Sequence, residues 1–213
     1  MSQLYIISPP QIELASFLPK LDDALARHSP ALFQLRLKFP HPSPLPQAGE
    51  GADLANSPLP LAGGNLLTPP PAGGRGVGGG QILEAAAAIK PICHKHGVKF
   101  IMNDSIELAL AAKADGVHLG MEDFAASGKT VADIKVLGLH VGLSCYNNLE
   151  YAIEQGASGA DLVCFGAFYP TTTTKPKAKA ELATLQKFVE ERNKYFPHPS
   201  PLPQAGEGAD LAN

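Results

Sequence analysis

The chain has 213 residues, a formal net charge of −3 at pH 7 and three cysteines. This length allows one domain or two small ones, and the near-neutral charge gives no electrostatic reason to expect nucleic acid or an anionic membrane as a partner. No apolar stretch approaches the roughly 20 residues that a membrane span needs. The first residues do not show the basic segment followed by an apolar run that is typical of a secretory signal, so we do not expect one. Three cysteines cannot form a disulfide framework, so we expect a cytoplasmic protein.

An 18-residue unit rich in proline and glycine occurs twice without one substitution. The copies are Phe39–Asn56 and Phe196–Asn213, and a similar composition continues from the first copy to Gly80. Alternating prolines exclude a helix interior or a central strand, and structural repeats share only a few packing positions rather than every residue. We interpret the unit as a translated nucleotide repeat. The alternative is a proline-rich linker that binds an SH3- or WW-type groove.

Apolar runs and amphipathic stretches alternate along the other 153 residues. The predicted strands are Leu4–Ile7, Leu32–Leu37, Val98–Met102, Val117–Leu119, Val141–Leu143 and Leu162–Phe165. The predicted helices are Ile12–Ala26, about Ile82–Cys93, Ile106–Lys113, Val131–Val136, Leu149–Gln155 and Leu182–Asn193. Strands that are each followed by a helix predict a parallel α/β fold with right-handed crossovers.

The number of residues per unit favours a barrel that lacks its last two units. A (β/α)₈ barrel uses about 25 to 31 residues per unit, and 153 residues over six units give about 25. We predict an incomplete TIM-type barrel domain over residues 1–195, interrupted at 39–80 by a disordered insert and followed by a disordered copy at 196–213. The missing strands would leave sheet edges exposed, through which the chain could self-associate.

Polar side chains at the end of the second strand predict an anion site. Gln34, Arg36 and Lys38 are spaced by two, so they project to one face of the strand. Cations on a buried strand are costly unless they meet an anion, and Arg with Lys suits a phosphate or pyrophosphate. The alternative is a solvated strand face.

Carboxylates follow the third and fourth strands. Asp104 and Asp123 come after neighbouring strands about 5 Å apart, close enough to share one hard divalent cation. With the cationic strand they indicate Mg²⁺ bridging to a pyrophosphate. The alternative for Asp104 is an N-cap of the next helix.

Two other patterns are weaker signals. Cys93, His94 and His96 could suggest zinc, but they have no second ligand pair, so structural or solvated roles are favoured. Cys145 could be a nucleophile, but a small apolar filler is the favoured interpretation.

Five segments resemble thiamine phosphate synthase (thiamine-phosphate pyrophosphorylase), in order and over nearly all of the 153 residues. They are Leu4–Pro10, Gln34–Lys38, Phe100–Asp104, Asp115–Asp123 and Phe165–Thr173. The resemblance implies a TIM barrel and a Mg²⁺-dependent transferase of thiamine biosynthesis. Such an enzyme joins hydroxymethylpyrimidine pyrophosphate to thiazole phosphate and releases pyrophosphate.

The resemblance also assigns roles to individual residues. It implies that Gln34, Arg36 and Lys38 on the second strand, together with Asn103, bind the pyrimidine pyrophosphate. It implies that Asp104 and Asp123 bind the metal. It implies catalytic roles for Arg36, Lys38 and Ser144, with Ser144 also binding substrate. It implies that Thr171, Thr172 and Thr173 bind the thiazole phosphate and that Lys175, which follows them, is a substrate-binding lysine.

The sequence departs from the family pattern in four ways. Met121 stands where the family usually has Gln, and an ungapped count puts the family lysine on Thr174, one residue before Lys175. The insert follows Lys38 directly, and the last two units are absent. The competing interpretations are therefore a non-enzymatic remnant and a related thiazole tautomerase. Arg36, Lys38, Asp104 and Asp123 argue against the tautomerase, which does not need a pyrophosphate and metal site.

Overall fold

The computed structural model of the chain describes residues 3–38, 77–169 and 179–195. These residues form two compact units, of which the first is Met1–Asn103 with Glu107–Ala114 and the second is Asp104–Ile106 with Asp115–Asn213. Both copies of the repeat and most of the predicted insert lie outside the described residues.

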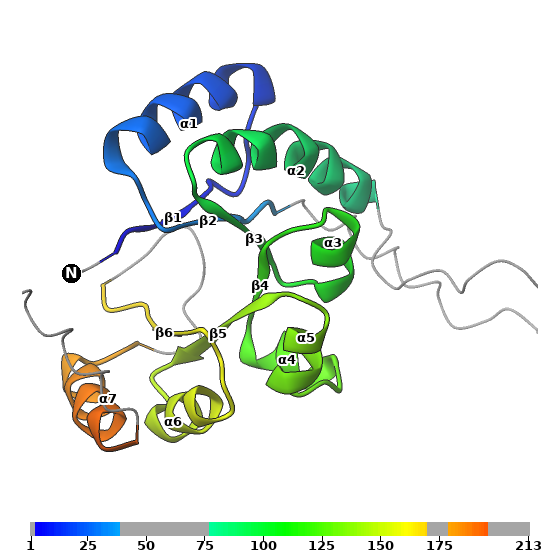
Figure 1. The fold of residues 1–213 in the computed structure, drawn as a ribbon. Helices are drawn as coiled ribbons and strands as arrows, with labels where there is room; N and C mark the ends of the chain where they lie inside the picture. Colours follow the sequence, from blue (N-terminus) through cyan, green and yellow to red (C-terminus); the bar gives the residue numbers. More distant parts are fainter. Residues whose placement is uncertain (1–2, 39–76, 170–178, 196–213) are drawn as a thin grey trace, which may run out of the picture. The chain divides into compact units, whose positions relative to one another are not determined.

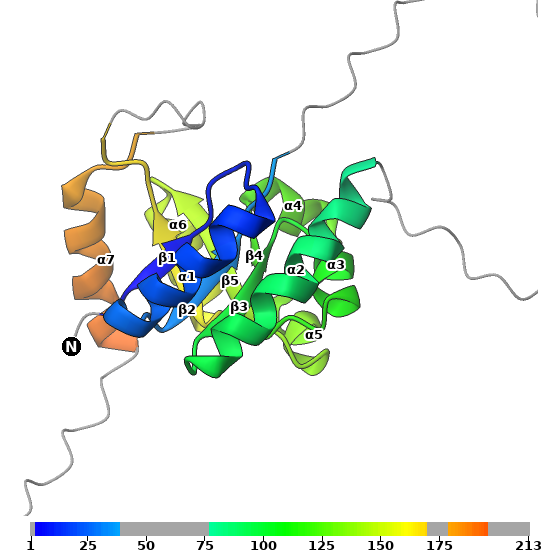
Figure 2. The same cartoon turned by 90° about the horizontal axis from the view of Figure 1, so that it is seen from above.

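The first unit is built on three parallel strands in chain order. They are β1 (Tyr5–Ile7), β2 (Leu32–Leu35) and β3 (Lys99–Asn103), with Ile7 opposite Gln34 and Leu35 opposite Met102. Helices α1 (Leu14–His28) and α2 (Val77–Lys95) pack side by side, and Figure 2 shows both over the same side of these strands. The short helix α3 (Ile106–Ala111) follows β3 (Figure 1).

Aromatic rings and one helix face make the core of this unit. Phe33 and Phe100 are fully buried and stack with ring centroids 6.5 Å apart, and Phe17 of α1 lies 6.5 Å from Phe33. Leu21 and Leu25 of α1 are also buried. Burial of each such side chain contributes about 1.5–3 kcal/mol, which holds α1 on the strands.

Helix boundaries in this unit differ from the prediction for local reasons. Helix α1 begins two residues late because the Glu13 carboxylate accepts hydrogen bonds from the Ala15 and Ser16 amides and so acts as the N-cap. Helix α2 begins at Val77 rather than Ile82, so the last four residues of the predicted insert are helical. Three of those four are glycines, whose low helix propensity hides the extra turn from sequence patterns.

A carboxylate on α1 joins the end of α2. Asp22 accepts hydrogen bonds from His96 Nε2 at 2.6 Å and from Lys95 Nζ at 2.9 Å. These bonds, the one from His96 foremost, hold the pKa of the Asp22 carboxyl below its ordinary value of 3.8. The bonds therefore stabilise the folded state above pH 3.8, and that contribution is lost as the pH falls through the lowered pKa.

We expect Asp22→Asn to lower the melting temperature at pH 7, with a difference from the parent chain that shrinks on acidification. The amide cannot carry the charge that selects these two partners, so the variant lacks the pH-dependent contribution. Thermal melts followed by circular dichroism between pH 7 and pH 2.5 measure the difference. The control is Asp23→Asn, which removes only an exposed pair with Arg27 inside α1. A difference that stays constant across this range would contradict the assignment.

The second unit also has three parallel strands in chain order. They are β4 (Gly116–Leu119), β5 (His140–Tyr146) and β6 (Leu162–Phe165). The helices are α4 (Met121–Ala126), α5 (Val131–Val136), α6 (Leu149–Ala157) and α7 (Leu182–Tyr195). Helices α6 and α7 pack against each other, and Phe188 of α7 covers Phe165 of β6 with ring centroids 5.1 Å apart (Figure 1).

Local hydrogen bonds define where the elements of this unit begin. Thr130 and Asp133 form a reciprocal capping box at the start of α5. The Asp161 carboxylate accepts bonds from the Val141 amide at 2.8 Å and from Lys135 Nζ at 2.9 Å, which ties α5 to β5. Burial alone would raise the pKa of Asp161, but these bonds outweigh it and the pKa is lowered.

Parallel strands, each followed by helix, confirm the predicted α/β class. None of the helices in the described ranges is both long and apolar enough to cross a membrane.

Candidate functional site at the carboxyl ends of the strands

The ends of β2 and β3 bring Gln34 and Asn103 together. Gln34 is 2% exposed, and its Nε2 donates a hydrogen bond to Asn103 Oδ1. A buried amide needs such a partner, since leaving it unsatisfied costs about 1–3 kcal/mol. The two predicted substrate-binding amides therefore form one fixed polar group in the first unit.

Arg36 and Lys38 follow directly after β2. The strand ends at Leu35 rather than Leu37, but its backbone stays anchored, because the Arg36 amide donates to Ser8 Oγ at 2.8 Å and the Lys38 amide to the Pro10 carbonyl at 2.8 Å. Arg36 is half-buried and Lys38 is exposed. Among the described residues neither side chain has an ion pair, so both cationic groups remain available to an anion.

Asp104 occupies a turn directly after β3 and belongs to the second unit. Its φ is +62°, and its amide donates to the His118 carbonyl at 2.8 Å. Helix α3 begins only at Ile106, and an N-cap residue has an extended backbone. The metal-binding role of Asp104 and its alternative role as an N-cap both stay predictions.

Asp123 lies in the first turn of α4, close to the backbone of Gly120. A Cβ at position 120 would lie 2.9 Å from Asp123 Oδ2, 3.4 Å from the Tyr146 hydroxyl and 3.7 Å from Glu122 Oε2. The Tyr146 hydroxyl also donates to Glu122 Oε2 at 3.2 Å. Glycine at 120 thus leaves room for an acidic corner made by Asp123, Glu122 and Tyr146.

Ser144 lies near the end of β5 and bonds to a histidine. Its Oγ is 2.9 Å from His118 Nε2, and His118 is only 6% exposed. Neither His118 nor Tyr146 was predicted as a site residue. A lone histidine inside the apolar run Gly116–Leu119 was the available signal for His118, whereas no sequence pattern pointed to Tyr146.

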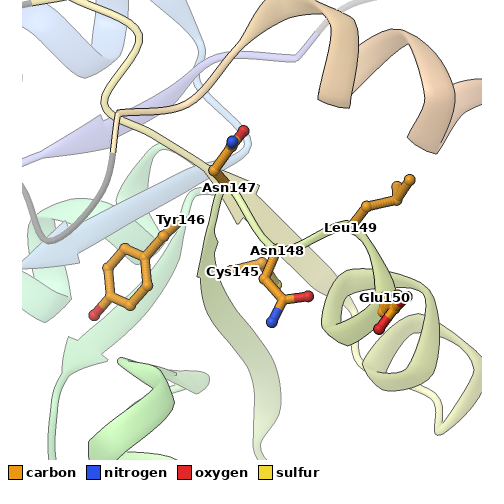
Figure 3. A pocket seen from close by; sticks show the side chains of 6 residues that line it. All are labelled: Cys145, Tyr146, Asn147, Asn148, Leu149 and Glu150. Carbon is orange, nitrogen blue, oxygen red and sulfur yellow. The ribbon is translucent and has the colours of Figure 1, made fainter.

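A pocket of about 580 Å³ opens where β5 passes into α6 (Figure 3). Its polar lining is partly structural, since the Asn148 side chain caps α6 through the Tyr151 amide at 3.0 Å, and Asn147 Oδ1 accepts from the Glu181 amide at 3.0 Å. Figure 3 shows the Tyr146 ring pointing away from Asn148. Tyr146 is therefore the lining residue that connects this pocket to the acidic corner.

Cys145 also lines this pocket, but its surroundings do not favour a nucleophilic thiolate. Its side chain is fully buried, and burial, with Cys164 nearby, raises the pKa of the thiol to about 12. The thiol therefore stays protonated at neutral pH. The favoured interpretation of Cys145 as an apolar filler agrees with this environment.

We expect Tyr151→Phe to raise the free energy of unfolding by about 1 kcal/mol, because a buried hydroxyl without a partner destabilises the fold. The Tyr151 hydroxyl is buried and has no hydrogen-bond partner among the described residues, and burial raises its pKa to about 12. Urea denaturation followed by circular dichroism measures the change. The control is Tyr146→Phe, which removes a hydroxyl that bonds to Glu122. A loss of stability in Tyr151→Phe would show that the hydroxyl has a partner.

Cys93 and His96, near the end of α2, have structural roles. Cys93 is fully buried and His96 bonds to Asp22. In the part of the chain that is described, no three His, Cys, Asp or Glu side chains gather as a metal cluster. Thr171, Thr172, Thr173 and Lys175 lie outside the described residues.

The fold and these polar strand ends define a class: a parallel β/α protein of the barrel type, with its polar residues at the carboxyl ends of the strands. A solved structure supports this class. The chain resembles the thiamine phosphate pyrophosphorylase of Pyrococcus furiosus with a TM-score of 0.54 and 23% identity, over 88% of this chain and 69% of that chain. This likeness confirms the predicted fold class.

Sequence comparisons identify the family. The family model described as thiamine monophosphate synthase matches residues 75–200. The thiamine-phosphate synthase of Rhodospirillum centenum is 31% identical over 181 residues, which are 84% of this chain and 68% of that protein. The chain therefore belongs to the thiamine monophosphate synthase family, as the sequence motifs predicted.

Other relatives match more closely over a shorter length. The thiamine-phosphate synthase of Aromatoleum aromaticum is 46% identical over 112 residues, which are 52% of this chain and 50% of that protein. The matched part spans about half the length of several such relatives.

Proposed function

We propose that the chain is a thiamine phosphate synthase, a transferase that joins hydroxymethylpyrimidine pyrophosphate to thiazole phosphate. Family membership supports this reaction class. The observation that carries the proposal is the end of β2, where a buried amide precedes two cationic side chains that have no ion pair among the described residues. Such a combination of an amide with two cations suits a bound pyrophosphate.

In this proposal the first unit binds the pyrimidine pyrophosphate. Gln34 and Asn103 present their remaining amide groups to the substrate, and their mutual hydrogen bond fixes both rotamers. Arg36 and Lys38 neutralise the pyrophosphate. The hydrogen bonds of their backbone amides to Ser8 and Pro10 fix the points from which the two side chains extend. From the family resemblance alone, Thr171, Thr172 and Thr173 are proposed for the thiazole phosphate, and Lys175 is proposed as a further substrate-binding residue.

The carboxylates of the second unit suit Mg²⁺. Mg²⁺ is usually held by one or two carboxylates together with water and substrate phosphates, rather than by a cage of protein ligands. Asp104 and Asp123 offer such a donor set, and the close approach of Asp123 to Gly120 orients its carboxylate. When bound, the ion would withdraw charge from the pyrophosphate.

The chemical step then needs positioning and charge stabilisation from the protein. The bond between the pyrimidine methylene and the pyrophosphate oxygen breaks, and its electron pair leaves with the pyrophosphate. The thiazole nitrogen donates its lone pair to the methylene carbon and forms the new bond. Arg36 and Lys38 stabilise the charge that develops on the leaving group, and Ser144 orients the pyrimidine.

The proposal also includes partners, location and self-association. The proposed partners are small-molecule substrates, with no nucleic acid or membrane partner. The three free thiols of Cys93, Cys145 and Cys164 support a cytoplasmic location. Two exposed apolar residues, Leu4 just before β1 and Ile7 at its end, support self-association through the sheet edge.

The test is product formation by the purified full chain with Mg²⁺ and both substrates, followed by mass spectrometry and by pyrophosphate release. We expect Lys38→Ala to abolish most of the turnover, while Lys20→Ala, at an exposed position of α1, leaves it unchanged. A folded chain that binds pyrophosphate but forms no product would favour the non-enzymatic remnant. Thiazole tautomerisation without transfer would favour the tautomerase.

A further inference from the structure

His118 is a buried titratable residue to which the proposed reaction assigns no role. It lies on β4 with 6% of its surface exposed. A buried polar ring needs hydrogen bonds to offset its lost hydration. The partner of its Nε2 is the side chain of Ser144, at 2.9 Å, and Ser144 is a half-buried residue proposed to contact substrate.

The position of the ring depends on the register of two strands. His118 lies directly opposite Gly142 in the parallel pair of β4 and β5. A Cβ at position 142 would lie 2.7 Å from His118 Nδ1, so only glycine leaves room for the ring to lie across β5. Ser144 is two residues further along β5 on the same face, which puts its hydroxyl within reach of Nε2.

The backbone of His118 contacts a second residue of the proposed site. Its carbonyl accepts the Asp104 amide at 2.8 Å. That bond holds the turn in which Asp104 has a φ of +62°. One residue thus touches a proposed metal ligand through its backbone and a proposed substrate contact through its ring.

The bond to the ring restricts what the Ser144 hydroxyl can do. A hydroxyl has one proton to donate and lone pairs to accept. The bond to Nε2 occupies one of these roles and selects the rotamer, which leaves the other role for a bound substrate. We infer that His118 is a positioning residue of the proposed transferase, acting through Ser144. This inference rests on the proposed function and extends it to a residue that does not itself touch substrate.

Steady-state kinetics test the inference through three variants. We expect His118→Leu, which cannot bond to Ser144, to lower kcat/KM for the pyrimidine substrate by roughly 10- to 100-fold, a range typical of residues that orient a contact residue. The KM for thiazole phosphate should stay near the parent value. His118→Gln, whose amide can reach the position of Nε2, should recover part of the loss. The double variant His118→Leu with Ser144→Ala should be no worse than Ser144→Ala alone, because the two residues act as a unit.

The control is His96→Leu, which removes another partly buried histidine that bonds to a side chain. It should keep the parent kinetics. Parent-like kinetics in His118→Leu, or losses that add in the double variant, would overturn the inference while leaving the proposed function standing.

Nuclear magnetic resonance of the imidazole nitrogens tests the bond without any turnover. In the full chain, Ser144→Ala should shift the His118 Nε2 resonance and leave the other six histidines unchanged. An unchanged His118 signal would overturn the inference whatever the kinetics show. A parent chain that forms no thiamine phosphate would refute the proposed function, and the nitrogen shifts would then decide the His118–Ser144 pairing alone. If His118→Leu does not fold, His118→Gln and Ser144→Ala still provide both measurements.

Discussion

Asp123→Asn is expected to lower the rate of thiamine phosphate formation by about 100-fold or more, a size typical of losing one group that stabilises charge in the reaction. Asparagine has nearly the shape of aspartate, so the first turn of α4 and the contact with Gly120 should persist. What is lost is the negative charge that Mg²⁺ prefers in a ligand. The variant should therefore also need a higher Mg²⁺ concentration for half-maximal rate.

The measurement is the initial rate as a function of Mg²⁺ concentration, with both substrates saturating. Glu190→Gln is the matched control, because it neutralises an exposed carboxylate of α7. Gly120→Ala supplies an intermediate case, since its methyl group would press on Asp123 Oδ2 from 2.9 Å and turn the carboxylate without removing it. A parent-like rate and Mg²⁺ response in Asp123→Asn would show that this carboxylate is not a metal ligand.

Gly142→Ala is expected to lower the free energy of unfolding by about 1–3 kcal/mol, the usual cost of overpacking a core. The new methyl group would stand 2.7 Å from His118 Nδ1. The ring is buried and bonded to Ser144, so it cannot move aside without breaking that bond. The substitution should therefore reduce both stability and turnover.

Urea denaturation followed by circular dichroism measures this loss. Gly80→Ala is the matched control, because it is the same substitution on the exposed side of α2, where a Cβ would contact nothing within 4 Å. In a helix this change should stabilise the fold by about 0.5–1 kcal/mol. Equal stability of Gly142→Ala and the parent would mean that the ring can lie elsewhere at no cost.

Sequence patterns predicted the bounds of an element correctly where the apolar residues and the flanking residues of that element mark its ends. The prediction for Val131–Val136 has the bounds of α5, whose Thr130 and Asp133 form a capping box, and the prediction for Leu162–Phe165 has the bounds of β6. Both segments combine a continuous apolar run or face with clear flanking residues. Such information is contained in a few neighbouring residues.

Local patterns failed where neighbours in space decide the structure. Helix α4 was not predicted, because its six residues carry no amphipathic period and its N-cap, Gly120, makes no side-chain bond. Strand β5 continues to Tyr146 rather than ending at Leu143, because β6 pairs with it across an irregularity between Ser144 and Tyr146. The partner strand supplies the hydrogen bonds that extend the element.

The sequence by itself determined the α/β class, the family and the residue types that suit a pyrophosphate and a divalent cation. The spacing of Gln34, Arg36 and Lys38 by two predicted that they share a face, since side chains two apart in a strand point to the same side. Tertiary structure alone decided that His118 meets Ser144 and that Tyr146 and Asp123 converge on Gly120. These contacts depend on strand register and on the space left by a missing Cβ. His118 with Ser144, and Tyr146 with Gly120, are pairs of residues from segments more than twenty residues apart, so the order of neighbouring residues does not reveal which partner each one meets.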